Sequence, residues 1–433
     1  MQIRAEPGAM SFVRHPPTGF VAPGFEQVLV VLSDSFARDI DKGCSFAAYY
    51  RGQPVVNIWG GVADRACRRP WKEDTMGFFY STTKFVACVT IAHMIERGLL
   101  KYDDTIATYW PEFAQNGKEN ITLEMLLSYR AGLAVLSDNF DVRWMIDNPR
   151  LLHDMLARQK PFWTPDTAHG YHPITLGLYL NEIVKRVDRK GRSLSQYYQE
   201  EIGQPFGIDF FIGLPKPLQY RASRLEIIKL TSEFQQQQMN TFKGNSTLLK
   251  LSMIQPKDWN AARKLNDPDF MEIPLPSSHG VGTALAVAKF CGILANGGKH
   301  EGKTLLSPES IAKLQEPLSC GLDLTTSGYD IIGRGTWLIP VVEGKKSWFM
   351  FGHAGLGDQC CAADPQYQVG WAYTTNFLDS TVVITGKNKW RPLIAALFEC
   401  VHKLENVQVE RTLLNTFEDV EQVRLCQKQS SHL

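Results

Sequence analysis

The sequence predicts a mixed α/β (α+β) protein in which helices flank one antiparallel sheet and a mainly helical lobe lies beside it. Three observations carry this prediction: two β-rich runs near the N-terminus, a series of strand candidates after Gly333, and an amphipathic helix at each end of the pattern. Because helix and sheet faces must be buried against each other, we expect the first and last helices to cover one face of a single sheet. The helical middle of the chain then forms the second lobe.

Residue spacing indicates the N-terminal elements. Apolar residues recur at helical intervals on one face of residues 25–40. The runs 45–50 and 55–59 are rich in β-forming residues and are joined by the short turn 51–54, which predicts a hairpin. The glycine pair 60–61 is expected to end the second strand.

Helical patterns follow one another through the middle of the chain, and strand patterns replace them towards the C-terminus. The segment 231–275 contains a glutamine run and several prolines, and we expect it to be a surface excursion. A last amphipathic helix is predicted over residues 393–404. The predicted helices between these are 81–98, 121–127, 140–160, 174–202 and 280–296, and the predicted strands are 335–339, 347–352, 359–363 and 368–375.

Composition argues against several classes of protein. The 433 residues include 46 Lys and Arg against 45 Asp and Glu without a basic block, so neither a nucleic-acid surface nor a polybasic membrane surface is indicated. No apolar run approaches about 18 residues without a charge, and the N-terminus has no apolar signal core, so no membrane span is expected. Nine cysteines without a C-x-x-C spacing indicate reduced thiols in a cytoplasmic protein. The oligomeric state stays open, a homo-oligomer included.

Ser81 and Lys84 form an S-x-x-K pair at the start of a helix. Residues three apart lie on the same helical face, so the hydroxyl and the amine can meet, as a serine nucleophile with a lysine base requires. The residues after Lys84 are apolar around the whole circumference, which predicts a buried helix. Burial lowers the pKa of a lysine, because desolvation disfavours the charged form. The alternative is an ordinary helix start with Ser81 as its cap.

Two further motifs follow in order. The first is the run Tyr171-His172-Pro173, and the second is His353-Ala354-Gly355 in a predicted strand. Together with the S-x-x-K pair, and with the flanking segments 126–133, 163–166 and 363–365, they resemble the serine β-lactamase-like family of class C β-lactamases, D-Ala-D-Ala carboxypeptidases and their esterase relatives. The resemblance covers residues 24–404.

The resemblance implies an organisation into lobes as well as a fold. It implies a hydrolase domain over 24–404, with an irregular lead-in before it and a tail after it. The α/β lobe would comprise 24–62 and 276–404, the helical lobe 63–275, the lead-in 1–23 and the tail 405–433. Neither a cofactor nor a metal is implied.

The resemblance also implies roles for individual residues. Ser81 would be the nucleophile, Lys84 its base, and Tyr171 the group that passes the proton to the leaving group. His353 would help to position Tyr171 or the substrate carbonyl. The backbone amides of Ser81 and of Leu356, the residue after Gly355, would bind the oxyanion.

Two departures from the family pattern bear on the substrate. Pro173 stands where the family has the Asn that contacts a β-lactam side chain and the lysine. His353 stands where many members have a lysine, and we expect it to titrate near pH 6.5 unless its surroundings shift it. Both changes favour a serine hydrolase that cleaves a small ester or amide through an acyl-enzyme over a β-lactamase. The alternative is a binding or assembly protein that keeps the fold without turnover.

Other interpretations of these residues stay open. Tyr171 taken alone could be a surface tyrosine, and His353 could serve packing. His169 and His172 lie three residues apart, but no third metal ligand is evident. The adjacent cysteines 360 and 361 are expected to belong to a strand rather than to a redox site.

The last three residues, Ser431-His432-Leu433, resemble the C-terminal peroxisomal address whose best-known form is Ser-Lys-Leu. An import receptor would be the partner implied by this tripeptide. The default location remains the cytoplasm, with the peroxisome as the alternative.

Overall fold

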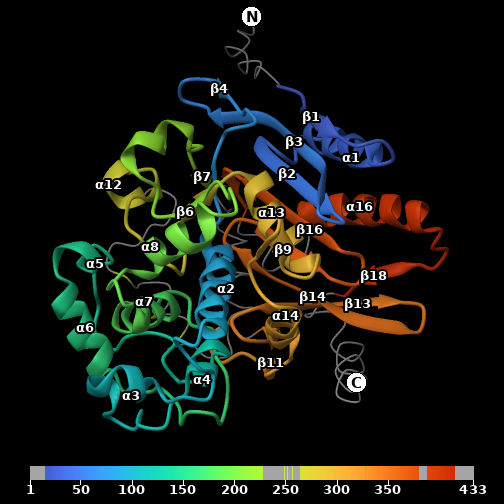
Figure 1. Cartoon of the computed structure of the whole chain (residues 1–433). Helices are drawn as coiled ribbons and strands as arrows, with labels where there is room; N and C mark the ends of the chain where they lie inside the picture. The colour runs from blue at the N-terminus through green and yellow to red at the C-terminus, as the bar shows by residue number, and fades with distance from the viewer. Residues whose placement is uncertain are drawn as a thin grey trace, which may run out of the picture.

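A large antiparallel sheet runs through the computed structural model, which describes residues 15–227, 264–326, 328–379 and 388–414 together with positions 248, 251 and 256 (Figure 1). The strands follow the order β1-β3-β2-β16-β15-β14-β13-β12-β11, each antiparallel to its neighbours. Their bounds are β1 Thr18–Val21, β2 Gly43–Tyr50, β3 Gln53–Asp64, β11 Ser319–Leu322, β12 Tyr329–Ile332, β13 Trp337–Glu343, β14 Lys346–Gly355, β15 Gln359–Asp364 and β16 Val369–Thr375.

Two helices from opposite ends of the sequence cover one face of this sheet. They are α1 (Glu26–Ala37) and α16 (Trp390–Glu405), which contact each other (Figure 1). Leu32 of α1, Leu397 of α16 and Trp371 of β16 belong to one buried apolar cluster. The prediction that the first and last helices share one face of the sheet is confirmed.

The opposite face carries α13 (Ala284–Ala295) and α2 (Thr83–Glu96). Phe85 of α2 meets Phe351 of β14 edge-on, with 5.8 Å between the ring centroids. Every α2 residue from Thr83 to Met94 is buried, because apolar side chains surround the helix on all sides. Figure 1 shows α2 standing between the sheet and the helical part of the molecule, as the sequence predicts.

Short helices build the helical part of the molecule. Their ends follow local capping chemistry: the Asn148 side chain accepts from the Leu151 amide ahead of Pro149, and Ser193 forms a reciprocal capping box with Gln196. The helices are α3 Ile106–Tyr109, α4 Leu123–Leu127, α5 Trp144–Asp147, α6 Pro149–Arg158, α7 Thr175–Val187, α8 Leu194–Tyr198, α12 Pro268–Met271 and α14 Pro308–Gln315, with single turns η1 Tyr80–Thr82, η2 Pro111–Phe113, η3 Gln199–Gly203 and η4 Lys216–Arg221.

Several short strands link the parts. The strands β5, β8 and β6 form a small antiparallel sheet just before the S-x-x-K turn, and β7 pairs with β17. Their bounds are β4 Arg69–Pro70, β5 Gly77–Phe78, β6 Phe210–Ile212, β7 Glu226–Ile227, β8 Gly280–Gly282, β9 Lys299–His300, β10 Lys303–Thr304, β17 Phe377–Leu378 and β18 Arg411–Leu413.

The predicted N-terminal hairpin is confirmed as β2 and β3. Its turn residues Arg51 and Gly52 have φ angles of 51° and 76°. A turn whose two central residues both have positive φ has a backbone twist that matches the right-handed twist of the flanking strands. The second strand continues to Asp64, however, so the prediction that it ends at the glycine pair 60–61 is wrong. Gly61 takes a φ of 75° and lets the strand pass close to the backbone of Lys42.

Three other predictions about strands need correction. Part of the lead-in 1–23 is β1, which pairs with β3, and part of the tail 405–433 is β18, which pairs with β13. The C-terminal strands begin with β11 and β12, before Gly333. Each of these strands has only three or four residues, so it lacks a long alternating pattern. Backbone pairing with distant partners holds them in place.

Two predicted features lie wholly or mostly outside the described residues. They are the tripeptide Ser431-His432-Leu433 and most of the surface excursion 231–275. Within the described part of the chain, no helix is long and apolar enough to cross a membrane. The eight cysteines in that part are all free thiols.

Candidate active site

Ser81 lies in a strained turn at the start of the buried helix α2. Tyr80, just before it, has a φ of 46°, which is uncommon for a residue other than glycine. The hydroxyl of Thr83 donates to the Tyr80 carbonyl at 2.5 Å and accepts from the amide of Gly280 at 2.8 Å. Phe79 N–H donates to Gly280 O at 2.8 Å. The β8 strand therefore holds the turn, and Ser81 alone among its helical neighbours stays half-buried rather than buried.

Lys84 reaches back to Ser81 as the one-turn spacing predicts. Its Nζ lies 3.1 Å from Ser81 Oγ and donates to the carbonyl oxygen of Ser277 at 2.8 Å. The side chain is fully buried. Burial holds the pKa of Lys84 well below its usual range, against a small opposing effect of the neighbouring Cys88. The amine therefore favours the neutral form, whose lone pair can accept a proton.

Tyr171 completes the group around the nucleophile. Lys84 Nζ lies 4.9 Å from the centre of the Tyr171 ring, and the ring of Tyr129 meets it edge-on at 5.2 Å. Burial raises the pKa of Tyr171, and the adjacent Ser81 hydroxyl opposes this rise. The buried phenolic oxygen has no formed hydrogen bond to any of the described residues. The phenolic proton of Tyr171 therefore has no other acceptor among the described residues and is available for transfer.

His353 lies on the same side of β14 as Phe351, facing α2. Its ring stacks on Trp337 of the neighbouring strand, with centroids 4.6 Å apart, and its Nδ1 lies 2.5 Å from the carbonyl oxygen of Ala354. A carbonyl only accepts, so Nδ1 carries the ring proton. Burial lowers the pKa of His353 to about 3. The surroundings of this histidine therefore shift its pKa below the value near 6.5 expected for an unperturbed ring, because its side chain is removed from water.

The end of β14 packs directly against the serine turn. Thr82 Oγ1 donates to the His353 carbonyl at 3.2 Å. A Cβ at Gly355 would lie 2.3 Å from the carbonyl oxygen of Phe79, so only glycine permits this approach. Leu356 follows in the turn between β14 and β15, with its side chain 44% exposed. The structure thus brings Gly355, the residue before Leu356, against the turn that carries Ser81.

A buried carboxylate anchors this turn from behind. Asp358, with a φ of 85°, accepts from the backbone amide of Lys389 at 2.6 Å and from the side-chain amide of Asn388 at 2.7 Å. These donors precede the first turn of α16. Burial raises the pKa of Asp358 to about 7.

His172 of the second motif bonds to the fold, rather than to a metal ion, through both of its ring nitrogens. His172 is fully buried, with Nδ1 donating to the carbonyl of Gly170 at 2.6 Å and Nε2 accepting from the amide of Leu133 at 3.1 Å. Both ring nitrogens are therefore used structurally. The described residues contain no group of three or more His, Cys, Asp or Glu arranged to hold a metal ion. Pro173, next to His172, is half-buried and offers no side-chain donor.

Sequence reasoning missed two residues that hold the site together. Ser277 gives its backbone carbonyl to Lys84, and its hydroxyl accepts from the Gly177 amide at 2.7 Å. Asp323 accepts from the Tyr171 amide at 2.6 Å. No local pattern marks either residue, because each contact joins segments a hundred or more residues apart and involves a backbone atom.

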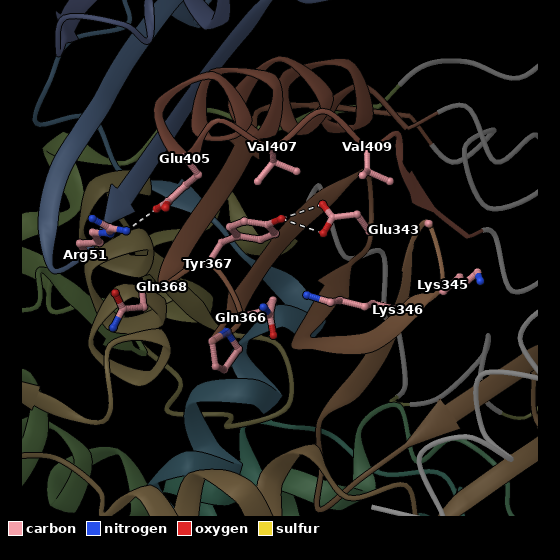
Figure 2. Close-up of a pocket in the computed structure, with 12 residues that line it drawn as sticks. Arg51, Glu343, Lys345, Lys346, Gln366, Tyr367, Gln368, Glu405, Val407 and Val409 are labelled. Atoms are coloured by element: carbon pink, nitrogen blue, oxygen red, sulfur yellow. Dashed lines mark hydrogen bonds and ion pairs between the residues drawn. The ribbon is translucent and has the colours of Figure 1, made fainter.

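A cavity of about 660 Å³ lies elsewhere on the molecule, between the β13–β14 turn, the β15–β16 turn and the segment after α16 (Figure 2). On its wall Arg51 pairs with Glu405. The strand β14 runs for 10 residues from Lys346 at this cavity to Gly355 at the serine turn. At about 3.3 Å per residue the two places are roughly 30 Å apart, so the cavity is not part of the Ser81 site.

The fold and the site together define a class of protein. An antiparallel sheet with a buried helix against its face, and a serine hydroxyl 3.1 Å from a buried lysine amine, describe a serine hydrolase of the S-x-x-K type. Comparison with known families agrees. Residues 34–392 match the family Beta-lactamase, so the chain belongs to that family.

Individual relatives agree in fold and in length. "Esterase/beta-lactamase LipL" of Mycobacterium tuberculosis is 27% identical over 379 residues, which span 85% of this chain and 84% of LipL. A crystal structure of a family VIII carboxylesterase superposes with a TM-score of 0.79 at 30% identity, covering 89% of this chain and 99% of that one. A penicillin-binding protein homologue from Caulobacter crescentus superposes with a TM-score of 0.75 at 30% identity. The match covers 89% of this chain and 99% of that one.

Proposed function

We propose that this chain hydrolyses small carboxylic esters, or amides of similar size, through an acyl-enzyme on Ser81. One observation carries the proposal: Ser81 Oγ lies 3.1 Å from the Nζ of a lysine whose burial favours the neutral amine. An amine without a proton can act as the base that a serine nucleophile needs. A permanently charged lysine at the same distance could not.

Acylation would use the groups around Ser81 in turn. Ser81 Oγ attacks the substrate carbonyl carbon while its proton passes to Lys84, and the carbonyl oxygen takes up the negative charge. The amides of Ser81 and Leu356 donate to that oxygen, an interaction worth a few kcal/mol, roughly 3 for one donor. The intermediate collapses when the bond to the leaving oxygen breaks and Tyr171 donates its phenolic proton to that oxygen. Lys84 then returns a proton to Tyr171.

Deacylation reverses these roles. A water molecule attacks the acyl carbon and gives its proton to the neutral amine of Lys84, and the bond to Ser81 Oγ breaks as that oxygen regains a proton from Lys84. The products are a carboxylic acid, an alcohol and the free serine. His353 stays neutral throughout, because its pKa is lowered to about 3. Its proposed part is to hold position beside Tyr171, whose ring centroid is 5.9 Å away.

Esters are favoured over β-lactams as substrates by the chain and by its relatives. Pro173 is half-buried, and its side chain has no amide that could bind a β-lactam. The name of LipL describes an esterase and a β-lactamase, and that of the family VIII carboxylesterase describes an esterase. These relatives support an ester-cleaving site without identifying the acyl group or the alcohol.

The experiment combines hydrolysis with covalent labelling. Short-chain p-nitrophenyl esters should be hydrolysed by the wild-type protein, and a fluorophosphonate probe should label it. Both activities should be lost in Ser81→Ala, which keeps the helix start. A wild-type protein that neither hydrolyses the esters nor reacts with the probe would instead support the alternative, a binding or assembly role of the same fold.

The cellular location remains a prediction from Ser431-His432-Leu433. We propose peroxisomal import as the alternative to a cytoplasmic location, and a fusion with a fluorescent protein at the N-terminus tests it. Punctate fluorescence that becomes diffuse on deletion of Leu433 would support import. Diffuse fluorescence of both forms would refute it.

A further inference from the structure

A carboxylate from another part of the fold holds the backbone of Tyr171. Asp323 directly follows β11 and is 1% exposed. Its Oδ2 accepts from the Tyr171 amide at 2.6 Å, while its Oδ1 accepts from the amides of Thr325 and Thr326 at 2.8 and 2.7 Å. Burial raises the pKa of Asp323, and the three backbone donors oppose that rise. One short hydrogen bond thus joins residues 152 positions apart.

Further contacts leave the Tyr171 segment little freedom. The Leu324 amide donates to the His169 carbonyl at 3.1 Å, and the Gly170 amide donates to the Tyr129 carbonyl at 3.1 Å. A Cβ at Gly170 would lie 2.7 Å from the Trp163 ring. The segment 169–171 is thus clamped from several sides, and Asp323 is the residue among those described whose carboxyl group bonds to Tyr171 itself.

We propose that Asp323 is a positioning residue, which fixes Tyr171 where its phenol can protonate the leaving oxygen. The inference rests on the proposed function and deepens it. A general acid must stand within hydrogen-bonding reach of the atom it protonates, and a displacement of about 1 Å can cost a hundredfold in rate. Through the amide of Tyr171, Asp323 sets the position from which that side chain projects.

Asp330 on β12 is a buried acid close to Asp323. Burial, with Asp323 nearby, raises the pKa of Asp330 to about 8. Asp330 therefore holds its proton at neutral pH.

The leaving group distinguishes this role from simple structural support. An ethoxide leaving group needs a proton as its bond breaks, whereas p-nitrophenolate leaves readily without one. The test therefore measures kcat/KM, which reports acylation, for ethyl acetate and p-nitrophenyl acetate, which form the same acyl-enzyme. In Asp323→Asn we expect a loss of about 30-fold or more for the ethyl ester and less than about 5-fold for the nitrophenyl ester. Asp330→Asn is the matched control, because it changes a neighbouring acid that is already protonated, and it should stay within about 3-fold on both esters.

A double-mutant comparison sharpens the test. In a Tyr171→Phe background, Asp323→Asn should cause no further loss on the ethyl ester, because the phenol it positions is gone. If Asp323→Asn does not fold, Asp323→Glu replaces it, since the longer side chain keeps the carboxyl group but displaces Tyr171.

Two results would overturn the positioning role. They are an equal loss on both esters in a folded variant, and an undiminished loss in the Tyr171→Phe background. A wild-type protein that cleaves neither ester would overturn the proposed function, and the positioning role with it.

Discussion

Ser277 presents its backbone carbonyl to Lys84 Nζ at 2.8 Å, although the two residues are 193 positions apart in the sequence. This contact aims the lysine at Ser81 by satisfying one N–H of the buried amine. The carbonyl carries no full charge, and burial lowers the pKa of Lys84 in spite of an opposing effect of Cys88. Lys84 is thus held in place without being forced into its charged form.

Lys84→Arg should abolish most of the activity. Arginine keeps the positive charge and the donors but does not lose its proton in proteins, so it cannot act as the base. We expect kcat/KM for p-nitrophenyl acetate to fall by about 1000-fold or more. Lys118→Arg is the control, since Lys118 is also buried but donates to the carbonyls of Gln115, Ala157 and Gln159 away from the site. It should alter thermal stability and leave kcat/KM within a few-fold. Comparable activity of Lys84→Arg and the wild type would contradict the base role.

His353 should not supply an ionisation near neutral pH. Its pKa is lowered to about 3, so the ring is neutral at every pH above about 5. His353→Gln should lower the rate by disturbing the stack on Trp337, yet its pH profile of kcat/KM should superimpose on that of the wild type after scaling. A limb near pH 6.5 that disappears in His353→Gln would show that the ring does titrate there.

Nitrocefin should be a poor substrate. Pro173 offers no side-chain donor to a β-lactam, whereas the ester reaction relies on Ser81, Lys84 and Tyr171. We expect kcat/KM for nitrocefin to lie at least about 100-fold below that for p-nitrophenyl acetate. Steady-state kinetics on the same preparation measures both values, and equal values would argue for a β-lactamase.

Asp358 should make stability depend on pH in a defined direction. Its folded-state pKa is raised to about 7, so the folded protein binds a proton that the unfolded chain has already lost above about pH 4. This contribution is fully present below about pH 4 and is lost as pH rises through about 7, at about 1.4 kcal/mol per pH unit for one proton. Denaturant unfolding measures the free energy of unfolding of the wild type and of Asp358→Asn. Over this pH range the wild type should lose stability relative to the variant. The exposed Glu119→Gln variant is the control, and a constant difference for Asp358→Asn would contradict the raised pKa.

The parts of the site that could be predicted are those fixed by local geometry. Ser81 and Lys84 meet because one helical turn separates them, and the apolar residues that follow announce a buried helix. The hairpin of β2 and β3 was equally local. The motif residues Tyr171 and His353 came from resemblance, and the structure places both beside Lys84.

The rest depends on contacts between distant segments. Any residue type can offer a backbone carbonyl, so the sequence around Ser277 does not reveal its partner. Asp323 gives no signal either, because its partner is a backbone amide. Burial lowers the pKa of His353, and the stacked ring of Trp337 is part of what buries it. That stack requires the register of β13 against β14. The edge strand β18 has only three residues, too few for a pattern.

The identity of the residue that carries the acyl group tests the central claim most directly. The protein is mixed with a slowly deacylated ester, its intact mass is measured, and the modified peptide is located by fragmentation. We expect one added acyl group on Ser81, absent in Ser81→Ala and retained in Ser278→Ala, whose buried hydroxyl has no partner among the described residues. An adduct on any other residue, or one that persists in Ser81→Ala, would contradict the account.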